Sequence, residues 1–351
     1  FIGHALKLNK KYRVLLVTKL DQNTSIHKNL KIKLININIK RKICFFSDFF
    51  LFFKFLLILL IEKPDMILSL TPKAGFFGMV VGFCCRVKIR LHIFTGQVWA
   101  NKKKGIYKYL LISLDKILAL AATHLLADSE GQRNFLSQNG ITNLRKIQTI
   151  HKGSICGVDI KKFQSNFKNR IKIRKKLAIS KNSIVLLYVG RVNYDKGILK
   201  LVNAFSKINK HLEQDIFLLI VGNDETGLSP IINKKLSDCK KKFKILGHKK
   251  NIYEYFQAAD IFCLPSEREG FGMSAIQASS CSLPVVCTDI YGLKSTVIHN
   301  KTGFKFKCNS TLDMYRYLLL LIKNKNTRLK YGKNGRQYAL QAFNDKIVLP
   351  L

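Results

Sequence analysis

Short apolar runs alternate with helix-like patterns along the whole chain, and this alternation restricts the folds open to it. Parallel strands need a long crossover between them, usually a helix, so the pattern predicts α/β layers with parallel sheets. The predicted strands lie at 13–18, 32–39, 66–70, 89–94, 123–127, 146–150, 183–189, 215–221, 243–246, 261–264 and 284–287.

Helix-like patterns fill the gaps between these strands, in two successive sets. At 351 residues the chain is long enough for two domains, and we expect two doubly wound, Rossmann-like domains that face a cleft. The first is predicted at 1–151 and the second at 181–325, with a basic connection at 152–180 and a helical segment at 326–351. The predicted helices lie at 1–12, 44–62, 75–85, 105–121, 130–139, 196–210, 229–240, 252–258 and 272–280.

The chain is very basic, with 61 Lys and Arg against 21 Asp and Glu and a formal net charge of +40. Such charge attracts nucleic acid or an anionic membrane surface, but a general bias toward Lys, Asn, Ile and Phe would produce it as well. A nucleic-acid partner is disfavoured, because no recognised module is present and the aromatic residues lie within apolar runs. An oxidoreductase is disfavoured too, because no G-x-G-x-x-G follows a strand.

Nine cysteines show no C-x-x-C or other metal-binding spacing, and we expect reduced thiols in a cytoplasmic protein. The most apolar run is 49–61 (FFLFFKFLLILLI). It is shorter than the roughly 20 residues that span a bilayer. A helix buried in the fold is favoured over one lying in the membrane interface, and both interpretations stay open.

Residues 265–278 (PSEREGFGMSAIQA) follow the predicted strand 261–264 and continue into a helix. A Glu-Gly-x-Gly turn at this place brings the Glu269 carboxylate and bare backbone N–H groups to a helix N-terminus. Such a turn can hold sugar hydroxyls and a phosphate. The alternative is that Glu269 only stabilises the helix start.

A second motif, residues 188–197 (YVGRVNYDKG), follows the predicted strand 183–189. Arg191 and Lys196 are five residues apart across a strand-to-helix turn, so both can point at one diphosphate. Two unrelated surface cations are the alternative. The combination with Glu269 favours a functional pair.

Together the two motifs resemble the nucleotide-sugar glycosyltransferases of family 4, retaining enzymes of the GT-B fold. Their E-x7-E signature has Glu269 first, with Gln277 in place of the second Glu, and Ser282 replaces a glycine of the following A-x-G-x-P. The resemblance implies that Arg191, Lys196 and Glu269 are catalytic and that Gln277 holds the ribose. The other donor-binding residues it implies are Gly190, Phe271, Gly272 and Met273.

The first half is similar to the subgroup that builds lipid-linked oligosaccharides in bacteria. Many relatives have a His-Gly pair after the fourth predicted strand, whereas this chain has Thr95-Gly96 with His92 three residues earlier. We expect these three residues and Lys73 on the acceptor side, and a packed histidine is the alternative for His92. The neighbouring 101–105 (NKKKG) suggests contact with an acceptor diphosphate or with lipid headgroups, and a solvated loop is the alternative. Residues 127–129 are interpreted as scaffold and 153–159 as a hinge.

The resemblance implies a metal-independent hexosyltransferase that needs no cofactor, because the UDP-sugar is its substrate. Its expected partners are that donor, a lipid-linked or saccharide acceptor and the anionic inner face of the plasma membrane. The substitutions at Gln277 and Ser282 leave one alternative, a weakened or non-catalytic nucleotide-sugar-binding protein. Family members have a strand and a glycine-containing loop before the helix at 1–12, so the chain is expected to be a fragment that lacks them.

Overall fold

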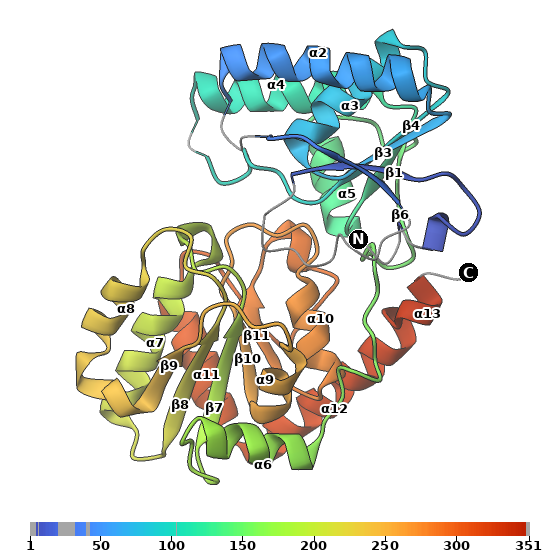
Figure 1. Cartoon of the computed structure of the whole chain (residues 1–351). Coiled ribbons are helices and arrows are strands. Elements are labelled where there is room, and N and C mark those ends of the chain that lie inside the picture. The colour runs from blue at the N-terminus through green and yellow to red at the C-terminus, as the bar shows by residue number, and fades with distance from the viewer. Residues whose placement is uncertain (1–4, 6, 20–31, 40–42, 103, 349–351) are drawn as a thin grey trace. The chain divides into compact units, whose positions relative to one another are not determined.

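Figure 1 shows the computed structural model of the chain, which describes residues 5, 7–19, 32–39, 43–102 and 104–348. The chain divides into two compact units. One comprises Phe1–Ile93 and Ser113–Leu125, and the other comprises Phe94–Ile112 and Leu126–Leu351. Parallel strands alternate with helices in both, as the sequence predicted. Residues 1–4 and 6 of the predicted first helix lie outside the described residues.

The first unit contains two sets of parallel strands. β1 pairs with β2, and β3 pairs with β4 so that Ser69 lies opposite His92. Next along the chain, β5 and β6 extend the second set to a sheet of order β3-β4-β5-β6. The elements of this half of the chain are β1 (Leu15–Thr18), β2 (Lys33–Asn36), α2 (Phe45–Glu62), β3 (Met66–Ser69), α3 (Pro72–Cys84), β4 (Ile89–Phe94), α4 (Ile106–Ala121), β5 (His124–Ala127), α5 (Glu130–Gln138) and β6 (Ile147–Thr149).

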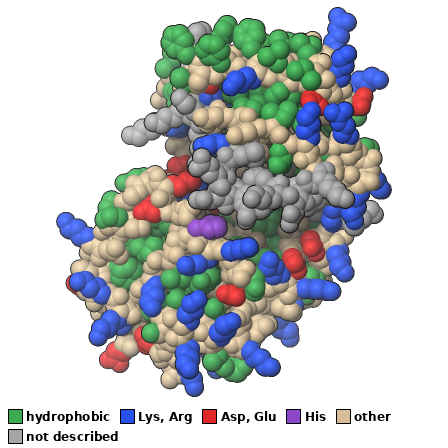
Figure 2. Space-filling view, in the orientation of Figure 1, with side chains coloured by type: hydrophobic (Ala, Val, Ile, Leu, Met, Phe, Trp, Pro, Cys, Tyr) green, Lys and Arg blue, Asp and Glu red, His purple; other side chains and the backbone are tan. Residues whose placement is uncertain are grey.

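Helix α2 buries only one of its faces. Leu51, Phe55 and Leu59 recur every four residues and pack with Phe77 and Val81 of α3. The opposite face is also apolar but exposed, and Figure 2 shows hydrophobic side chains gathered over this helix. The favoured prediction of a buried helix is therefore correct for one face only. Among the described residues, no helix is long and apolar enough to cross a membrane.

The second unit is built on a six-stranded parallel sheet of order β12-β11-β10-β7-β8-β9. The chain fills one side of the sheet from β7 to β9 and then returns to add β10 on the other side of β7. The strand order therefore reverses between β7 and β10, and ligands of open α/β sheets bind beyond the strand ends at such a point. The strands are β7 (Ile184–Val189), β8 (Ile216–Val221), β9 (Phe243–Ile245), β10 (Ile261–Leu264), β11 (Val285–Thr288) and β12 (Gly303–Phe306).

Helices cover both faces of this sheet (Figure 1). Alternate residues of β7 belong to two separate hydrophobic clusters, because successive side chains of a strand point to opposite faces. All six residues of β7 and of β8 are buried, which explains their continuous apolar sequences. The helices are α6 (Phe167–Lys176), α7 (Ile198–His211), α8 (Ser229–Lys235), α9 (Tyr253–Ala258), α10 (Met273–Ser280), α11 (Thr311–Lys323), α12 (Lys325–Ala342) and α13 (Asp345–Val348).

Four elements of the second unit differ from the prediction. The segment predicted as a connection contains α6, which is held by ion pairs from Arg170 and Arg174 to Asp260, at 2.7 and 2.6 Å. Strand β12 and helix α11 were not predicted. The helix predicted at 196–210 begins only at Ile198, because the turn before it is a 3₁₀ helix, Tyr194–Lys196.

Candidate active site

The two sequence motifs meet at the carboxyl ends of β7 and β10, which are hydrogen-bonded neighbours. Lys196 follows β7, Glu269 follows β10, and the Lys196 Nζ lies 2.5 Å from the Glu269 Oε1. Both side chains are mostly buried, with 14% and 15% of their surface exposed. An ion pair in such a place is less screened than one at the surface. Two residues separated by 73 positions in the sequence therefore form one charged centre.

The turn that carries Lys196 is fixed by its two neighbours. The Asn193 side chain accepts a hydrogen bond from the Lys196 backbone N–H, at 3.1 Å. Gly197 has φ +63°, a region that favours glycine. A Cβ at this position would lie 2.1 Å from the carbonyl oxygen of Pro265, the first residue after β10. Gly197 thus lets the turn after β7 pack directly on the loop after β10.

Arg191 lies in a different ion pair from Lys196. Its guanidinium is 2.8 Å from Glu225, which also accepts a hydrogen bond from the Asn193 side chain at 3.1 Å. Glu225 therefore links both ends of the turn after β7. The neighbouring Asp224 accepts hydrogen bonds from the backbone N–H groups of Leu228 and Ser229 at the start of α8. Burial raises the pKa of Asp224, but these hydrogen bonds lower it to about 2.

The loop after β10 leads directly into α10. The Phe271 side chain is buried against Phe343, with ring centroids 5.1 Å apart, so only its backbone is left to face a ligand. Gly272 has φ +77° and precedes the first helical residue, Met273. Gln277 is one turn further on, and the two side chains lie on the same partly exposed face. Two of the predicted donor-binding residues, Met273 and Gln277, therefore share one face of α10.

Gly190 lies where β7 and β8 end side by side. Its backbone N–H donates to the carbonyl of Val221, and a Cβ on the following Gly222 would collide with the Gly190 carbonyl oxygen. The hydroxyl of Tyr188 donates to the Arg191 carbonyl at 2.7 Å. These contacts hold the start of the turn after β7 close to the sheet.

Thr95 and Gly96, predicted on the acceptor side, lie against the loop that carries Glu269. A Cβ at Gly270 would be 2.5 Å from the Thr95 carbonyl oxygen, and one at Gly96 would be 3.1 Å from the Gly270 nitrogen. The Ser129 hydroxyl donates to the Gly270 carbonyl at 2.8 Å. The loop is therefore enclosed by segments from far earlier in the sequence, all within the second unit.

His92 and Lys73, also predicted on the acceptor side, lie in the first unit. The His92 ring is buried, and its Nδ1 is 2.7 Å from the Ser69 hydroxyl oxygen. Burial lowers the pKa of His92 to about 3, so the ring is neutral at pH 7. Lys73 forms an ion pair with Asp48 at 2.6 Å. The structure therefore gives His92 the environment of a packed histidine and Lys73 a partner on α2.

Asp128 is a candidate residue that the sequence interpretation treated as scaffold. It follows β5, and its Oδ2 would be 3.1 Å from a Cβ placed on Gly270. Burial, together with the charge of Glu269, raises the pKa of Asp128 to about 7, although a hydrogen bond from the Ile155 backbone N–H opposes this rise. A carboxyl group with such a pKa beside a charged residue is typical of functional sites.

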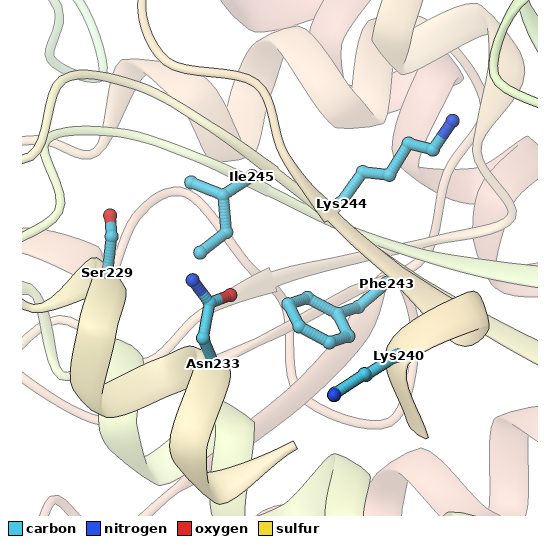
Figure 3. Close-up of a pocket in the computed structure, with 6 residues that line it drawn as sticks. All are labelled: Ser229, Asn233, Lys240, Phe243, Lys244 and Ile245. Carbon is cyan, nitrogen blue, oxygen red and sulfur yellow. The ribbon is translucent and has the colours of Figure 1, made fainter. Parts of the chain in front are cut away.

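A separate hollow of about 630 Å³ lies beside α8 and β9 (Figure 3). No predicted site residue lines it. Its lining residues are Ser229, Asn233, Lys240, Phe243, Lys244 and Ile245. Among the described residues, no cluster of His, Cys, Asp and Glu could hold a metal ion.

Solved structures share this architecture, and one of them holds UDP and glucose. The structure of HepE from Anabaena in complex with UDP and glucose superposes with a TM-score of 0.78 and 18% identity, over 98% of this chain and 92% of that one. Sucrose-phosphate synthase from Thermosynechococcus elongatus has the same TM-score and 20% identity, with 98% and 88% covered. At this level of identity the likeness shows the fold, and it confirms the predicted GT-B architecture.

The sequence comparisons agree with the fold. The family model "Glycosyl transferases group 1" matches residues 169–338. The chain is 30% identical over 314 residues to the capsular polysaccharide biosynthesis glycosyltransferase CapM of Staphylococcus aureus, over 89% of this chain and 81% of that relative. It is 25% identical over 291 residues to the N,N'-diacetylbacillosaminyl-diphospho-undecaprenol alpha-1,3-N-acetylgalactosaminyltransferase of Campylobacter jejuni, with 81% and 74% covered. The chain therefore belongs to the group 1 glycosyltransferases and is an enzyme of the GT-B fold.

Proposed function

We propose that this glycosyltransferase moves a hexose or N-acetylhexosamine from a UDP-sugar to a lipid-linked acceptor, with retention of configuration at the anomeric carbon. The Lys196–Glu269 pair at the switch point of the second sheet carries the proposal. In this pair, a cation that can bind a diphosphate lies beside a carboxylate that can accept hydrogen bonds from sugar hydroxyls. The names of the relatives support the acceptor class, since one acts on a sugar linked through diphosphate to undecaprenol.

In the proposed reaction, the bond from the anomeric carbon to the diphosphate breaks while the acceptor hydroxyl attacks from the same face and passes its proton to the departing diphosphate oxygen. Negative charge grows on the departing oxygen, and Lys196 stabilises it with Arg191 contributing from the neighbouring pair. These cations supply the positive charge that the departing group needs, so we propose a reaction without a metal ion or other cofactor. Glu269 accepts hydrogen bonds from the sugar, and the side chain of Gln277 pairs with the ribose hydroxyls.

A transfer assay tests the proposed function. The protein is incubated with radiolabelled UDP-sugars, one at a time, together with a lipid extract that contains acceptors linked through diphosphate. We expect label to enter the organic phase with one UDP-sugar and UDP to be released in equal amount. Binding of UDP-sugars without transfer or hydrolysis would instead identify a non-catalytic nucleotide-sugar-binding protein, the alternative that Gln277 suggests.

We also propose that the protein associates peripherally with an anionic membrane surface, where a lipid-linked acceptor resides. The exposed face of α2 supplies the apolar contact, with Phe46 78% and Ile61 74% exposed. Lys54 is exposed on the same helix, and the net charge of +40 attracts anionic lipid. Phe49, Phe50, Phe53, Leu57 and Leu60 complete this face.

The double variant Phe50→Ser/Ile61→Ser is expected to bind anionic vesicles at least tenfold more weakly than the native protein. Each removed side chain gives up roughly 1.5–3 kcal/mol of apolar burial if it enters the membrane. Cosedimentation measures the effect, and native binding should fall with added salt because surface charges are screened within about 8 Å at physiological ionic strength.

The control for this experiment is Leu329→Ser on α12, a residue that is 60% exposed in the other unit. It removes an exposed leucine without touching α2, so its vesicle binding should equal that of the native protein. Equal binding of the native protein to neutral and anionic vesicles would contradict the electrostatic part of the proposal.

A further inference from the structure

Asp128 lies where three segments of the second unit meet. Its carboxyl group faces Gly270 in the loop after β10 and accepts a hydrogen bond from the backbone N–H of Ile155. Its own backbone N–H donates to the Gln132 side chain at 2.8 Å, and its carbonyl accepts from the Ser154 N–H at 2.8 Å. The main chain of Asp128 is therefore held from both sides, which fixes where its carboxyl group lies.

The loop that faces Asp128 is closely packed at Gly270. Gly270 is enclosed by the Thr95 carbonyl and the Asp128 carboxyl, and the Ser129 hydroxyl holds its carbonyl oxygen. Glu269, which precedes Gly270, points to Lys196. A change of charge on Asp128 consequently acts on the loop that carries the proposed sugar-binding carboxylate.

In the described part of the chain, the titratable groups that interact with the Asp128 carboxyl group are a carboxylate and a thiol. Glu269 contributes a negative charge from the loop after β10, and the Cys156 thiol is close enough to interact from the segment after Gly153. Lys196 is paired with Glu269, so its positive charge is already shared. Residues 95–97 (Thr-Gly-Gln) bring no titratable side chain. Ionised Asp128 would thus add a second carboxylate beside Glu269 without a cation of its own among these groups.

We propose that Asp128 is a positioning residue of the transfer site that works in its protonated form, so that donor binding is controlled by the proton on this carboxyl group. The inference rests on the proposed donor site. When neutral, Asp128 packs against the loop and leaves Glu269 as the one carboxylate beside the donor sugar. When ionised, it repels both Glu269 and the diphosphate of the donor. Because burial and Glu269 raise the pKa of Asp128 to about 7, this change falls in the physiological range.

The first test is the affinity for UDP-sugar measured by calorimetry between about pH 6 and pH 8. If the donor binds the protonated form, native affinity should fall about tenfold over this range, since Asp128 with a pKa near 7 loses its proton across it. Asp128→Asn keeps the shape and stays neutral, so its affinity should be the same at both ends. Ser129→Ala, which loses the hydrogen bond to Gly270 and the one that caps α5 but keeps the Asp128 carboxyl group, should bind more weakly and retain the native pH dependence.

A second measurement separates this inference from the proposed function. Below pH 7 the folded protein holds a proton on Asp128 that the unfolded chain releases near pH 4, so the stability of the native protein falls as pH rises toward 7. The difference in Tm between Asp128→Asn and native protein should therefore widen from pH 4.5 to 7 and stay constant above. This pH dependence of the Tm difference is expected whether or not a UDP-sugar is the donor. A Tm difference independent of pH, or the same pH dependence of donor affinity in native protein and Asp128→Asn, would overturn the proposal.

Discussion

Replacing Lys196 with alanine is expected to lower kcat by about 10²–10³-fold, because the proposed leaving diphosphate loses its nearest cation. The estimate follows from the roughly 2.7–4 kcal/mol that one preorganised electrostatic contact gives a transition state. Glu269, which pairs with Lys196, would also lose its partner in a mostly buried place, so sugar binding should weaken as well. Steady-state kinetics with saturating acceptor measure both effects.

Lys200→Ala is the matched control for this variant. Lys200 lies four residues further along and forms a similar ion pair with Glu267, at 2.6 Å, but it also donates to the Cys308 carbonyl and does not contact Glu269 in any described interaction. Its loss should change kcat by less than about threefold, since a partly exposed ion pair contributes on the order of 1 kcal/mol or less. Native kcat in Lys196→Ala would remove this residue from the reaction.

The strands of the second unit were predictable from the sequence because of how they are covered. β7 and β8 are buried on both faces, so every residue is apolar and the run stands out. The motifs after β7 and β10 were predictable for a related reason, since Gly197 and Gly270 each lie where another backbone segment approaches too closely for a side chain.

Helix α6 could not be predicted in the same way. Its sequence, FKNRIKIRKK, has no broad apolar stripe, and its attachment depends on Arg170 and Arg174 reaching Asp260 on a distant segment. The charges that hold the helix are the same charges that made the segment look like a solvated connection. A packed helix and a solvated connection are distinguished here by the position of Asp260. This residue lies beside β7, where its carboxylate also accepts a hydrogen bond from the Val185 N–H.

The same limit applies to Asp128. In the sequence it is one polar residue before a helix that Ser129 caps, and nothing local separates it from scaffold. Asp128 becomes a candidate site residue because Glu269 and Gly270 lie beside it in the fold. These residues are distant in the sequence: the contact between Ser129 and Gly270 joins positions 141 residues apart. A raised pKa arises from burial and from neighbours in space, so neither cause is visible in the order of residues.

Gly197→Ala is expected to destabilise the protein by about 3 kcal/mol and to lower Tm by roughly 4 °C, for two reasons that add. Alanine at φ +63° is strained by about 1 kcal/mol, and its Cβ would meet the Pro265 carbonyl oxygen at 2.1 Å. Because the clash is with a backbone atom in a packed region, it is relieved only if the turn after β7 moves away from the loop after β10. That separation would pull Lys196 from Glu269, so transfer should fall along with stability.

Gly227→Ala isolates the first of these reasons, the conformational strain. Gly227 has φ +70°, close to that of Gly197, but a Cβ there would meet no atom within 4 Å. The variant should therefore cost only the conformational strain, about 1 kcal/mol, and leave transfer unchanged. Tm and kcat are measured for both variants. The loss in Gly197→Ala minus the loss in Gly227→Ala gives the contribution of the Pro265 contact. Equal losses of Tm in the two would mean that the chain relieves the contact easily, and that the close packing of the two loops does not hold Lys196 in place.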